Sequence, residues 1–253
     1  MKVSGVVVSH GHAADLERSL PALGPQVDEL LVIANVAGSA GRLPAGTRLL
    51  ENPEPLPFAA NANLGIAATT GEYVLLANPD ALPEPDAVAT LVEFADANPW
   101  CGVAGPQMRY PDGTWQPARR RFPTVADTLV RRTPLRVLFP PFETQRRHYY
   151  LDERPERPVP TETMLGAFML LRRTMLDELG GFDPGFRMYC EDIDLCYRAS
   201  RLGWERWHVP AALVHHEYAA EIDKRFWTVR NLWHLQGMVR FVRKHPERLL
   251  AVV

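Results

Sequence analysis

The sequence predicts an α/β fold in a single domain, with a mostly parallel central sheet flanked by helices. Apolar residues make up 46% and charged residues 23% of the 253 residues, which is typical of a globular chain with a full core. In the first hundred residues, short and continuously apolar segments alternate with segments of helical apolar spacing. Continuous apolar segments indicate parallel strands that helices cover on both faces.

The first half is expected to contain four strands and three helices. In chain order the strands are predicted at 3–9, 29–35, 47–51 and 72–78, and the helices at 13–20, 61–70 and 86–98. Pro85 precedes the third helix, in whose first turn proline is tolerated. Ligands of such sheets bind beyond the carboxyl ends of the strands. The positions of interest therefore directly follow the strands, at 9–12, 35–38, 51–53 and 78–80.

The second half lacks a complete alternation of its own, so no second independent domain is expected. Pro111-Asp112-Gly113 predicts a turn between two strands within 102–122. Further elements are expected as strands at 168–173, 204–210 and 211–217, and as helices at 174–181, 193–203 and 222–245. We divide the domain into two halves, 1–110 and 111–253.

A Pro- and Arg-rich region spans residues 119–157. Within 119–148, eight arginines stand against Asp127 and Glu143, a net charge of +6. This charge has two equally good explanations. The segment could bind a diphosphate or another anionic ligand, or it could be a solvated, mobile surface. Residues 139–160 hold five prolines and little apolar periodicity, which predicts a mobile loop.

Composition and absent motifs exclude several classes. The net charge of −2 gives no general attraction to nucleic acid, and no segment approaches the roughly 18 apolar residues of a membrane span. The start lacks a signal-peptide pattern, so we expect an unprocessed cytoplasmic protein, with peripheral contact at the inner membrane face left open. Three cysteines without a C-x-x-C pair predict reduced, buried thiols. The phosphate-binding loop of P-loop enzymes, the dinucleotide fingerprint and the α/β-hydrolase nucleophile motif are all absent.

Asn78-Pro79-Asp80 directly follows the apolar segment YVLLA. Pro79 removes a backbone N–H and turns the chain out of the sheet, which leaves Asp80 at the carboxyl end of a strand. A carboxylate there can hold Mg²⁺ or Mn²⁺ on a phosphorylated ligand. The alternative is an ordinary turn that ends a strand, because all three residue types favour turns.

Three carboxylates lie within four residues at Glu191, Asp192 and Asp194. One aspartate would suffice to cap the helix that follows. Three carboxylates repel one another and raise at least one pKa, as a general base often requires. Capping and catalysis remain equally good interpretations of this cluster.

His215-His216 end an apolar strand. A lone histidine is more often structural than a ligand, but the two carboxylate sites raise the odds that one histidine completes a metal site.

Several blocks resemble inverting nucleotide-sugar glycosyltransferases of family 2, which have the GT-A fold, and within them a bacterial rhamnosyltransferase-like branch. The matching blocks are VVVSHGHAADLERSL, FAANANLGIAATTGEYVLLANPDALPEPDAV, PDGTWQPARRRFPT, GAFMLLRRTMLDELGGFDPGFRMYCEDIDLCYRASRLGW, and VHHE followed by RNLWHL. They run in family order from residue 6 to about residue 245. The resemblance implies metal-dependent transfer of a sugar from a nucleoside diphosphate to an acceptor hydroxyl. It makes 1–110 the nucleotide-sugar-binding half and 111–253 the acceptor-binding and catalytic half, with the Pro- and Arg-rich loop near 139–160 on the acceptor side.

The resemblance also implies roles for individual residues. It assigns the catalytic base to Asp192 with Glu191 as its partner, and a divalent cation, Mg²⁺ or Mn²⁺, to Asp80 and His215. It assigns the nucleotide sugar to Ser9, His10, Gly11, Asn35, Asn61, Asn63, Asn78 and Arg230. Gly166 and Asp194 are assigned to the acceptor side, with Asp194 as a capping or supporting carboxylate.

Two departures from the family pattern affect the expected donor. The family usually has asparagine at Gly11, and an aspartate that reads uracil or thymine at Ala34, for which Asn35 could substitute. The branch favours a dTDP-linked deoxysugar such as rhamnose, with UDP-linked sugars as the alternative. The acceptor is expected to be a glycan, a lipid-linked saccharide or a small molecule. Two other functions stay open, an inactive nucleotide-binding module and a sugar nucleotidyltransferase.

Overall fold

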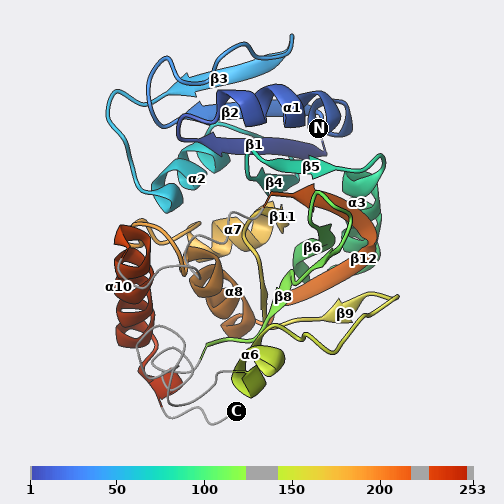
Figure 1. Cartoon of the computed structure of the whole chain (residues 1–253), viewed down its shortest axis with the longest axis vertical. Helices are drawn as coiled ribbons and strands as arrows, with labels where there is room; N and C mark the ends of the chain where they lie inside the picture. Colours follow the sequence, from blue (N-terminus) through green and yellow to red (C-terminus); the bar gives the residue numbers. More distant parts are fainter. Residues whose placement is uncertain (1, 124–141, 218–227, 250–253) are drawn as a thin grey trace.

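A mixed central sheet organises residues 2–123, 142–217 and 228–249, which are the residues that this computed structural model describes (Figure 1). In spatial order its main strands are β3 (Thr47–Glu51), β2 (Glu29–Ala34), β1 (Val3–Ser9), β4 (Tyr73–Ala77), β11 (Phe168–Arg172), β6 (Cys101–Arg109), β12 (Glu205–His216) and β5 (Ala81–Pro83). β1 thus lies between β2 and β4, so the chain adds strands on both sides of β1, as in a doubly wound sheet. The α/β class and the central sheet flanked by helices agree with the sequence prediction.

The N-terminal strands pair in parallel, as predicted. β1 pairs with β2 and β4, and β2 pairs with β3, all in parallel. The intervening helices are α1 (Ala13–Leu23), α2 (Phe58–Ala67) and α3 (Ala87–Ala97), with a short 3-10 turn, η1 (Gly24–Gln26), after α1. α2 begins three residues earlier than predicted, directly after Pro57, which has the extended backbone of a residue that precedes a helix.

The second half makes the sheet mixed. β11 lies antiparallel between β4 and β6, whereas β12 runs parallel to β6. β12 is one long strand where two were predicted at 204–210 and 211–217. Its pairing with β6 shifts register between Val209 and Leu213, so the irregularity around Pro210 interrupts the pairing without ending the strand.

Short strands extend the sheet near the Pro- and Arg-rich region. β7 (Trp115–Gln116) pairs with β6 across the predicted turn, where Gly113 has a φ of 80°. β9 (Val159–Pro160) pairs with β12, and β8 (Arg119–Arg120) pairs with β10 (Thr163–Met164) in a second small sheet. Within the loop predicted at 139–160, residues 142–148 form helix α6 (Phe142–His148). Residues 124–141, which include much of the basic segment, lie outside the described residues.

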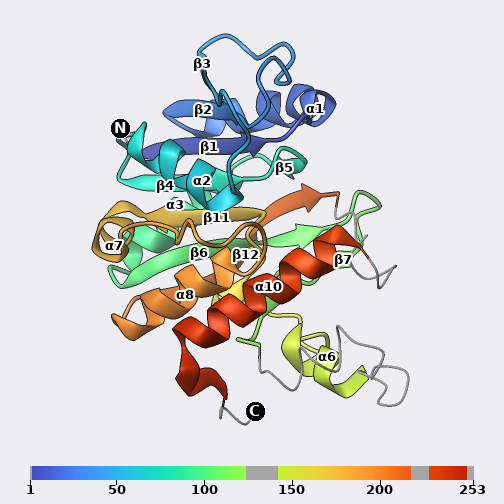
Figure 2. The ribbon, with the colours of Figure 1, turned by 90° about the vertical axis from the view of Figure 1, so that its left-hand side faces the viewer.

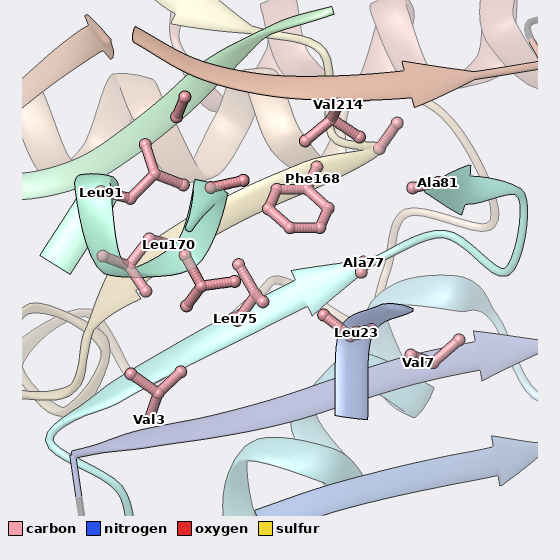
Figure 3. Packing of buried hydrophobic residues seen from close by; sticks show 14 of the residues in the cluster. Val3, Val7, Leu23, Leu75, Ala77, Ala81, Leu91, Phe168, Leu170 and Val214 are labelled. Atoms are coloured by element: carbon pink, nitrogen blue, oxygen red, sulfur yellow. The ribbon is translucent and has the colours of Figure 1, made fainter. Parts of the chain in front are cut away.

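Helices cover both faces of the sheet. α1 and α3 pack on one face, where Leu75, Leu91 and Phe168 meet in one hydrophobic cluster (Figure 3). The helices on the other face are α2, α7 (Arg173–Leu179), α8 (Glu191–Arg201) and α10 (Val229–Lys244), followed by the 3-10 turn η2 (Pro246–Leu249) (Figure 2). Among the described residues, no helix has both the length and the apolarity that crossing a membrane requires.

The three cysteines are free and buried, as predicted. Burial raises the pKa of Cys101 to about 12 and that of Cys196 to about 11, which keeps these thiols protonated and unreactive.

Candidate active site

Asp80 lies just beyond the carboxyl end of β4, where the sequence predicts a ligand site. The backbone N–H of Asn78 donates to the carbonyl oxygen of Ala167 at 2.8 Å, and the N–H of Ala81 donates to the carbonyl oxygen of Asn78 at 3.2 Å. The hydroxyl of Ser19 donates to the carbonyl oxygen of Pro79 at 2.7 Å. These bonds hold the turn, so the partly exposed Asp80 side chain has a defined position at the sheet edge.

The histidine beside Asp80 is His216, not His215. The Nε2 atom of His216 lies 3.5 Å from Oδ1 of Asp80, and the ring is buried. His215 points to the other side of β12, because successive strand residues face opposite ways, and its Nε2 atom lies 2.8 Å from Oε1 of Glu84. The metal-ligand prediction therefore chose the wrong one of two adjacent histidines as the neighbour of Asp80.

Gln116 orients the His216 ring. Its Oε1 atom lies 3.1 Å from Nδ1 of His216, and its side-chain N–H donates to the carbonyl oxygen of His216 at 3.4 Å. With the Gln116 amide in this orientation, Nδ1 donates its proton to Oε1 and Nε2 faces Asp80. Metal-binding histidines are commonly oriented in this way by an acceptor on their second nitrogen.

The donor set at Asp80 and His216 suits a divalent cation that a diphosphate also binds. A carboxylate oxygen and an imidazole nitrogen are both suitable ligands for such a cation. Across the described residues, no three His, Cys, Asp or Glu side chains come together to hold a metal by themselves. Cations that bind diphosphates use few protein ligands and complete their shell with phosphate and water oxygens. The two residues therefore fit a shared protein and ligand site.

Asp192 is held at the N-terminal turn of α8 by backbone donors. Its Oδ2 atom accepts the N–H of Gly166 at 3.1 Å, and its Oδ1 atom accepts the N–H of Ile193 at 2.8 Å. A Cβ atom on Gly166 would lie 3.0 Å from Oδ2 of Asp192, closer than most such contacts. The missing side chain of Gly166 thus lets this carboxylate approach the chain that leads into β11.

The pairing of β11 with β4 brings Asp80 and Asp192 to the same sheet edge. Phe168 pairs with Ala77 across the two strands, and Ala167 accepts the N–H of Asn78. The residue before Ala167, Gly166, binds Asp192. Two carboxylates more than a hundred residues apart in the sequence are therefore linked through one antiparallel strand pair.

The environment raises the pKa of both carboxyls in the Glu191-Asp192 pair. Burial, followed by the negative charge of Asp192, raises the pKa of Glu191 to about 8, and its Oε2 atom is buried with no hydrogen-bond partner among the described residues. Burial raises the pKa of Asp192 as well, while the charge of Arg120 and the backbone N–H groups of Ile193 and Gly166 oppose the rise. A carboxylate with a raised pKa and a nearby cation can accept a proton near neutral pH.

Arg120 is a residue that the sequence prediction of the site omitted. It lies on β8, and its guanidinium carbon is 5.3 Å from the ring centroid of Tyr149, in the first segment after α6. β8 pairs with β10, which leads through Leu165 to Gly166, so Arg120 is held near the Asp192 carboxylate. The only signal in the sequence was the run of three arginines at 119–121.

Asp194 does not cap α8, so of the two roles predicted for this residue, capping is wrong and the supporting role stays a prediction. The residue before the helix is Cys190, in the left-handed region at φ 69°, and no side chain caps the helix. Asp194 is fully buried instead and binds three basic side chains, one of its own helix and two at the end of α10. Its partners are Arg198 at 2.7 Å, Lys244 at 3.0 Å and His245 at 2.8 Å. It therefore anchors the end of α10 to α8.

The loop after β1 is open to solvent on the same side of the molecule. Ser9 is buried and its hydroxyl accepts the N–H of His12 at 3.2 Å, whereas His10 and Gly11 are exposed. Gly11 has a φ of +83°, and a Cβ atom there would meet no other atom within 4 Å. This left-handed backbone conformation explains why glycine fits here. Asparagine also adopts it more readily than most residues.

A buried asparagine network shapes the loop between β3 and α2. The amide of Asn52 donates to Oδ1 of Asn35 at 2.9 Å and to Oδ1 of Asn61 at 2.6 Å. The Asn35 amide also donates to the carbonyl oxygen of Leu56 at 2.9 Å and lies 3.2 Å from Nδ1 of His10. Asn52 directly follows a predicted strand, so its position in the sequence was a usable signal that the prediction did not develop.

Two more predicted residues lie apart from these groups. The side-chain amide of Asn63 both donates to and accepts from the backbone of Phe182, at 2.8 Å each, and so joins α2 to the loop after α7. Arg230 is exposed in the first turn of α10. The structure thus brings together Asp80 with His216, and Asp192 with Glu191, Gly166 and Arg120, and it groups His10, Asn35 and Asn61 around Asn52.

Several known proteins are similar to this chain in sequence. The model of the family described as "Glycosyltransferase like family 2" matches residues 26–232. An N-acetylglucosaminyl-diphospho-decaprenol L-rhamnosyltransferase of Mycobacterium tuberculosis is 32% identical over 85% of this chain and 75% of its own length. The rhamnosyltransferase WbbL of Escherichia coli K12 is 26% identical over 97% of this chain and 94% of its own length.

A solved structure supports the fold. The crystal structure of GalNAc-T7 with UDP, GalNAc and Mn²⁺ has a TM-score of 0.67 to this chain at 16% identity, over 96% of the chain. This chain spans about half the length of that protein, 48%. The similarity is one of fold and confirms the GT-A architecture.

Proposed function

The chain belongs to glycosyltransferase-like family 2, and from this premise we propose that it transfers a sugar, with inversion, from a nucleoside-diphosphate donor to an acceptor hydroxyl. The proposal gives residues 1–110 the donor and residues 111–253 the acceptor and the catalytic base. Asp80 and His216 would hold a divalent cation, Mg²⁺ or Mn²⁺, and Asp192 would be the base.

The observation that carries the proposal is that the pairing of β4 with β11 brings Asp80 and Asp192 to the same end of the sheet. Inverting transfer needs two groups at the reacting carbon, one that removes the acceptor proton and one that stabilises the leaving group. The two carboxylates differ in surroundings as these tasks require. Asp80 is half-buried beside His216, whereas Asp192 is bound by backbone N–H groups near Arg120.

The proposed reaction is a single displacement. The acceptor oxygen bonds to the anomeric carbon as the bond from that carbon to the diphosphate oxygen breaks, and Asp192 takes the hydroxyl proton. Asp80 and His216 would hold a divalent cation whose charge would stabilise the departing diphosphate. Glu191, whose pKa is raised to about 8, stays largely protonated at neutral pH and so adds no second negative charge beside the base.

The proposed donor is a dTDP- or UDP-linked sugar, with rhamnose as the first candidate. The names of the two rhamnosyltransferases similar to this chain support a deoxysugar. We infer that His10, Gly11 and Asn35 lie nearest the nucleoside, since His10 and Gly11 are exposed after β1 and Asn35 is bound to His10. Asn61 would act by holding the shape of the loop, because the protein itself uses its amide.

The proposed acceptor is a lipid-linked saccharide, with a free glycan or small molecule as alternatives. Support comes from the name of the mycobacterial relative, which acts on a decaprenol-linked diphosphate sugar. Arg120, whose charge acts on Asp192, would suit an anionic acceptor group close to the base.

The test combines donor binding with turnover. Thermal-shift screening of nucleotide sugars with Mn²⁺ or Mg²⁺ should find a donor that stabilises the wild-type protein, and Asp80→Ala should remove the metal dependence of that binding. Asp192→Asn should lower turnover by about 10²–10⁴-fold with donor affinity nearly unchanged, because it loses only the proton acceptor.

Three outcomes would contradict the proposal. Donor binding without any transfer or donor hydrolysis would indicate an inactive nucleotide-binding module. Formation of a nucleotide sugar from a nucleoside triphosphate and a sugar phosphate would indicate a nucleotidyltransferase. Full activity of Asp192→Asn would place the base elsewhere.

A further inference from the structure

The outward face of α10 exposes a stripe of apolar side chains. Val229, Leu232, Leu235 and Val239 are 61%, 53%, 40% and 43% exposed, and they recur every three or four residues. This spacing puts them on one side of the helix. They make up four of the ten large apolar side chains that are most exposed among the described residues, so the exposure is concentrated on this helix.

The opposite face of α10 fixes the helix in this orientation. Met238 and Phe241 are buried in the cluster that covers the sheet. A Cβ atom on Gly237 would lie 2.7 Å from the carbonyl oxygen of Tyr189, so the backbones of α10 and the segment before α8 are in close contact at that point. Asp194 binds Lys244 and His245 at the other end. The helix cannot rotate to bury the stripe without breaking these contacts.

The helix α10 itself is positively charged. α10 contains no acidic residue, and its exposed polar side chains are Gln236 and four cations, namely Arg230, Arg240, Arg243 and Lys244. Asp183, from the loop after α7, contacts Arg240 and Lys244 at 2.8 Å each. Lys244 also contacts Asp194 at 3.0 Å, so Arg240, Arg243 and Lys244 face two carboxylates at this end of the helix and leave a positive excess there.

A shallow hollow of about 690 Å³ adjoins the stripe. Leu235 and Val239 line it together with Gln236, with the cations Arg240, Arg243 and Lys244, and with Asp183. Apolar and cationic side chains thus share one surface depression, in which long arginine and lysine side chains can place their charges beside the apolar groups. The N-terminal end of α10 lies on the side where β6 and β12 end, so this face continues toward the candidate active site (Figure 2).

We propose that the outward face of α10 docks on an anionic membrane surface. Helices that lie in the membrane interface combine an exposed apolar stripe with flanking lysines and arginines and few acidic residues. Lipid headgroup phosphates match the positive excess, and acyl chains match the stripe. A second copy of the chain fits less well, because a symmetric contact would place the cations of both copies together. The proposal deepens the lipid-linked acceptor named above, and vesicle binding tests it separately from activity.

The test is sedimentation of the full chain with vesicles. Wild type should sediment with phosphatidylcholine vesicles that contain phosphatidylglycerol, much less with phosphatidylcholine alone, and less again at high salt. Leu232→Gln should weaken binding about tenfold, since it removes one large apolar side chain from the stripe. Arg243→Gln should weaken it about fivefold, the effect of one basic residue at an anionic surface.

Matched control variants lie on a distant surface. Leu49 on β3 is 45% exposed, and Arg42 is exposed in the loop before it, so Leu49→Gln and Arg42→Gln change the same chemistry away from α10. Both should bind vesicles as wild type does, and all four variants should keep the wild-type melting temperature within a few degrees. Equal losses in the controls would overturn the assignment to α10.

Other results would also overturn the proposal. No sedimentation of wild type with the anionic vesicles would exclude this membrane contact. A dimer in solution that Leu232→Gln abolishes would assign the face to self-association. Donor-induced thermal stabilisation is measured on the same samples. If no donor binds while vesicle binding follows α10, the proposed function fails and the membrane proposal stands.

Discussion

At the scale of single residues, the candidate base depends on its charged neighbours. Asp192 is buried enough that its pKa is raised, and Arg120 is the nearby charge that opposes the rise. A base must be deprotonated to act, so Arg120 extends the active pH range downward. Glu191, whose pKa is about 8, would remain neutral near pH 7 and so would not raise the pKa of Asp192 further.

The first prediction tests this charge. Arg120→Gln should raise the pKa of Asp192, and activity is lost as pH falls through that pKa. The acidic limb of the kcat/KM profile should therefore move to higher pH, with less change at alkaline pH. The measurement is a pH-rate profile with the preferred donor and acceptor.

Arg121→Gln is the matched control for this prediction. The Arg121 guanidinium carbon lies 5.2 Å from the ring centroid of Tyr150, and Arg120, not Arg121, is the main cation that lowers the pKa of Asp192. Its acidic limb should stay in the wild-type position. A shift of the same size in both variants would show that the effect comes from general loss of positive charge.

At the scale of secondary-structure elements, α8 and α10 are joined through one buried carboxylate. Asp194 on α8 binds Arg198 of its own helix as well as Lys244 and His245 at the end of α10. The same helix α8 begins with the Glu191-Asp192 pair. The anchoring of α10 and the position of the candidate base therefore depend on one element.

The second prediction follows from this anchor. Asp194→Asn should lower the free energy of unfolding by about 3 kcal/mol, because it removes a buried charge and leaves its basic partners without their counter-charge. Denaturant unfolding measures this loss. Asp152→Asn breaks an ion pair with Arg146 at the surface and should leave the free energy of unfolding nearly unchanged. Equal stability of Asp194→Asn and wild type would mean that the three contacts contribute little.

At the scale of the whole molecule, the candidate site is assembled from both halves of the chain. β4 supplies Asp80, the segment before β11 supplies Gly166, β12 supplies His216, and α8 supplies Asp192. No one half of the sequence contains the complete arrangement. The mixed sheet order, in which β11 and β12 lie beside strands from the first half, produces it.

The third prediction separates the two adjacent histidines. His216→Ala should weaken donor binding that depends on Mn²⁺ or Mg²⁺ by about tenfold or more, the usual cost of losing a metal ligand or its orienting partner. His215→Ala should bind donor as wild type does, because His215 contacts Glu84 instead. Calorimetric titration with nucleoside diphosphate, with and without the cation, measures both. The reverse result would return the role to His215.

The sequence by itself determined the parts of the protein that depend on local pattern. Continuous apolar segments identified β1, β2 and β4 within a residue or so, because a buried parallel strand needs apolar residues on both faces. The motif around Asp80 identified a strand end, because Pro79 has no N–H for the sheet. The acidic cluster before α8 was visible because three carboxylates so close together are costly without a purpose.

Only the tertiary structure decided which of these residues meet. The short strands β5 and β10 could not be predicted from the sequence, because strands of two or three residues form only beside a partner strand. The roles of His216 and Asp194 depended on side-chain direction and on partners such as Gln116 and Lys244, which lie far away in the chain. Local sequence sets the propensity and periodicity of each element, whereas contacts between distant segments arise from the packing of the complete sheet and its helices.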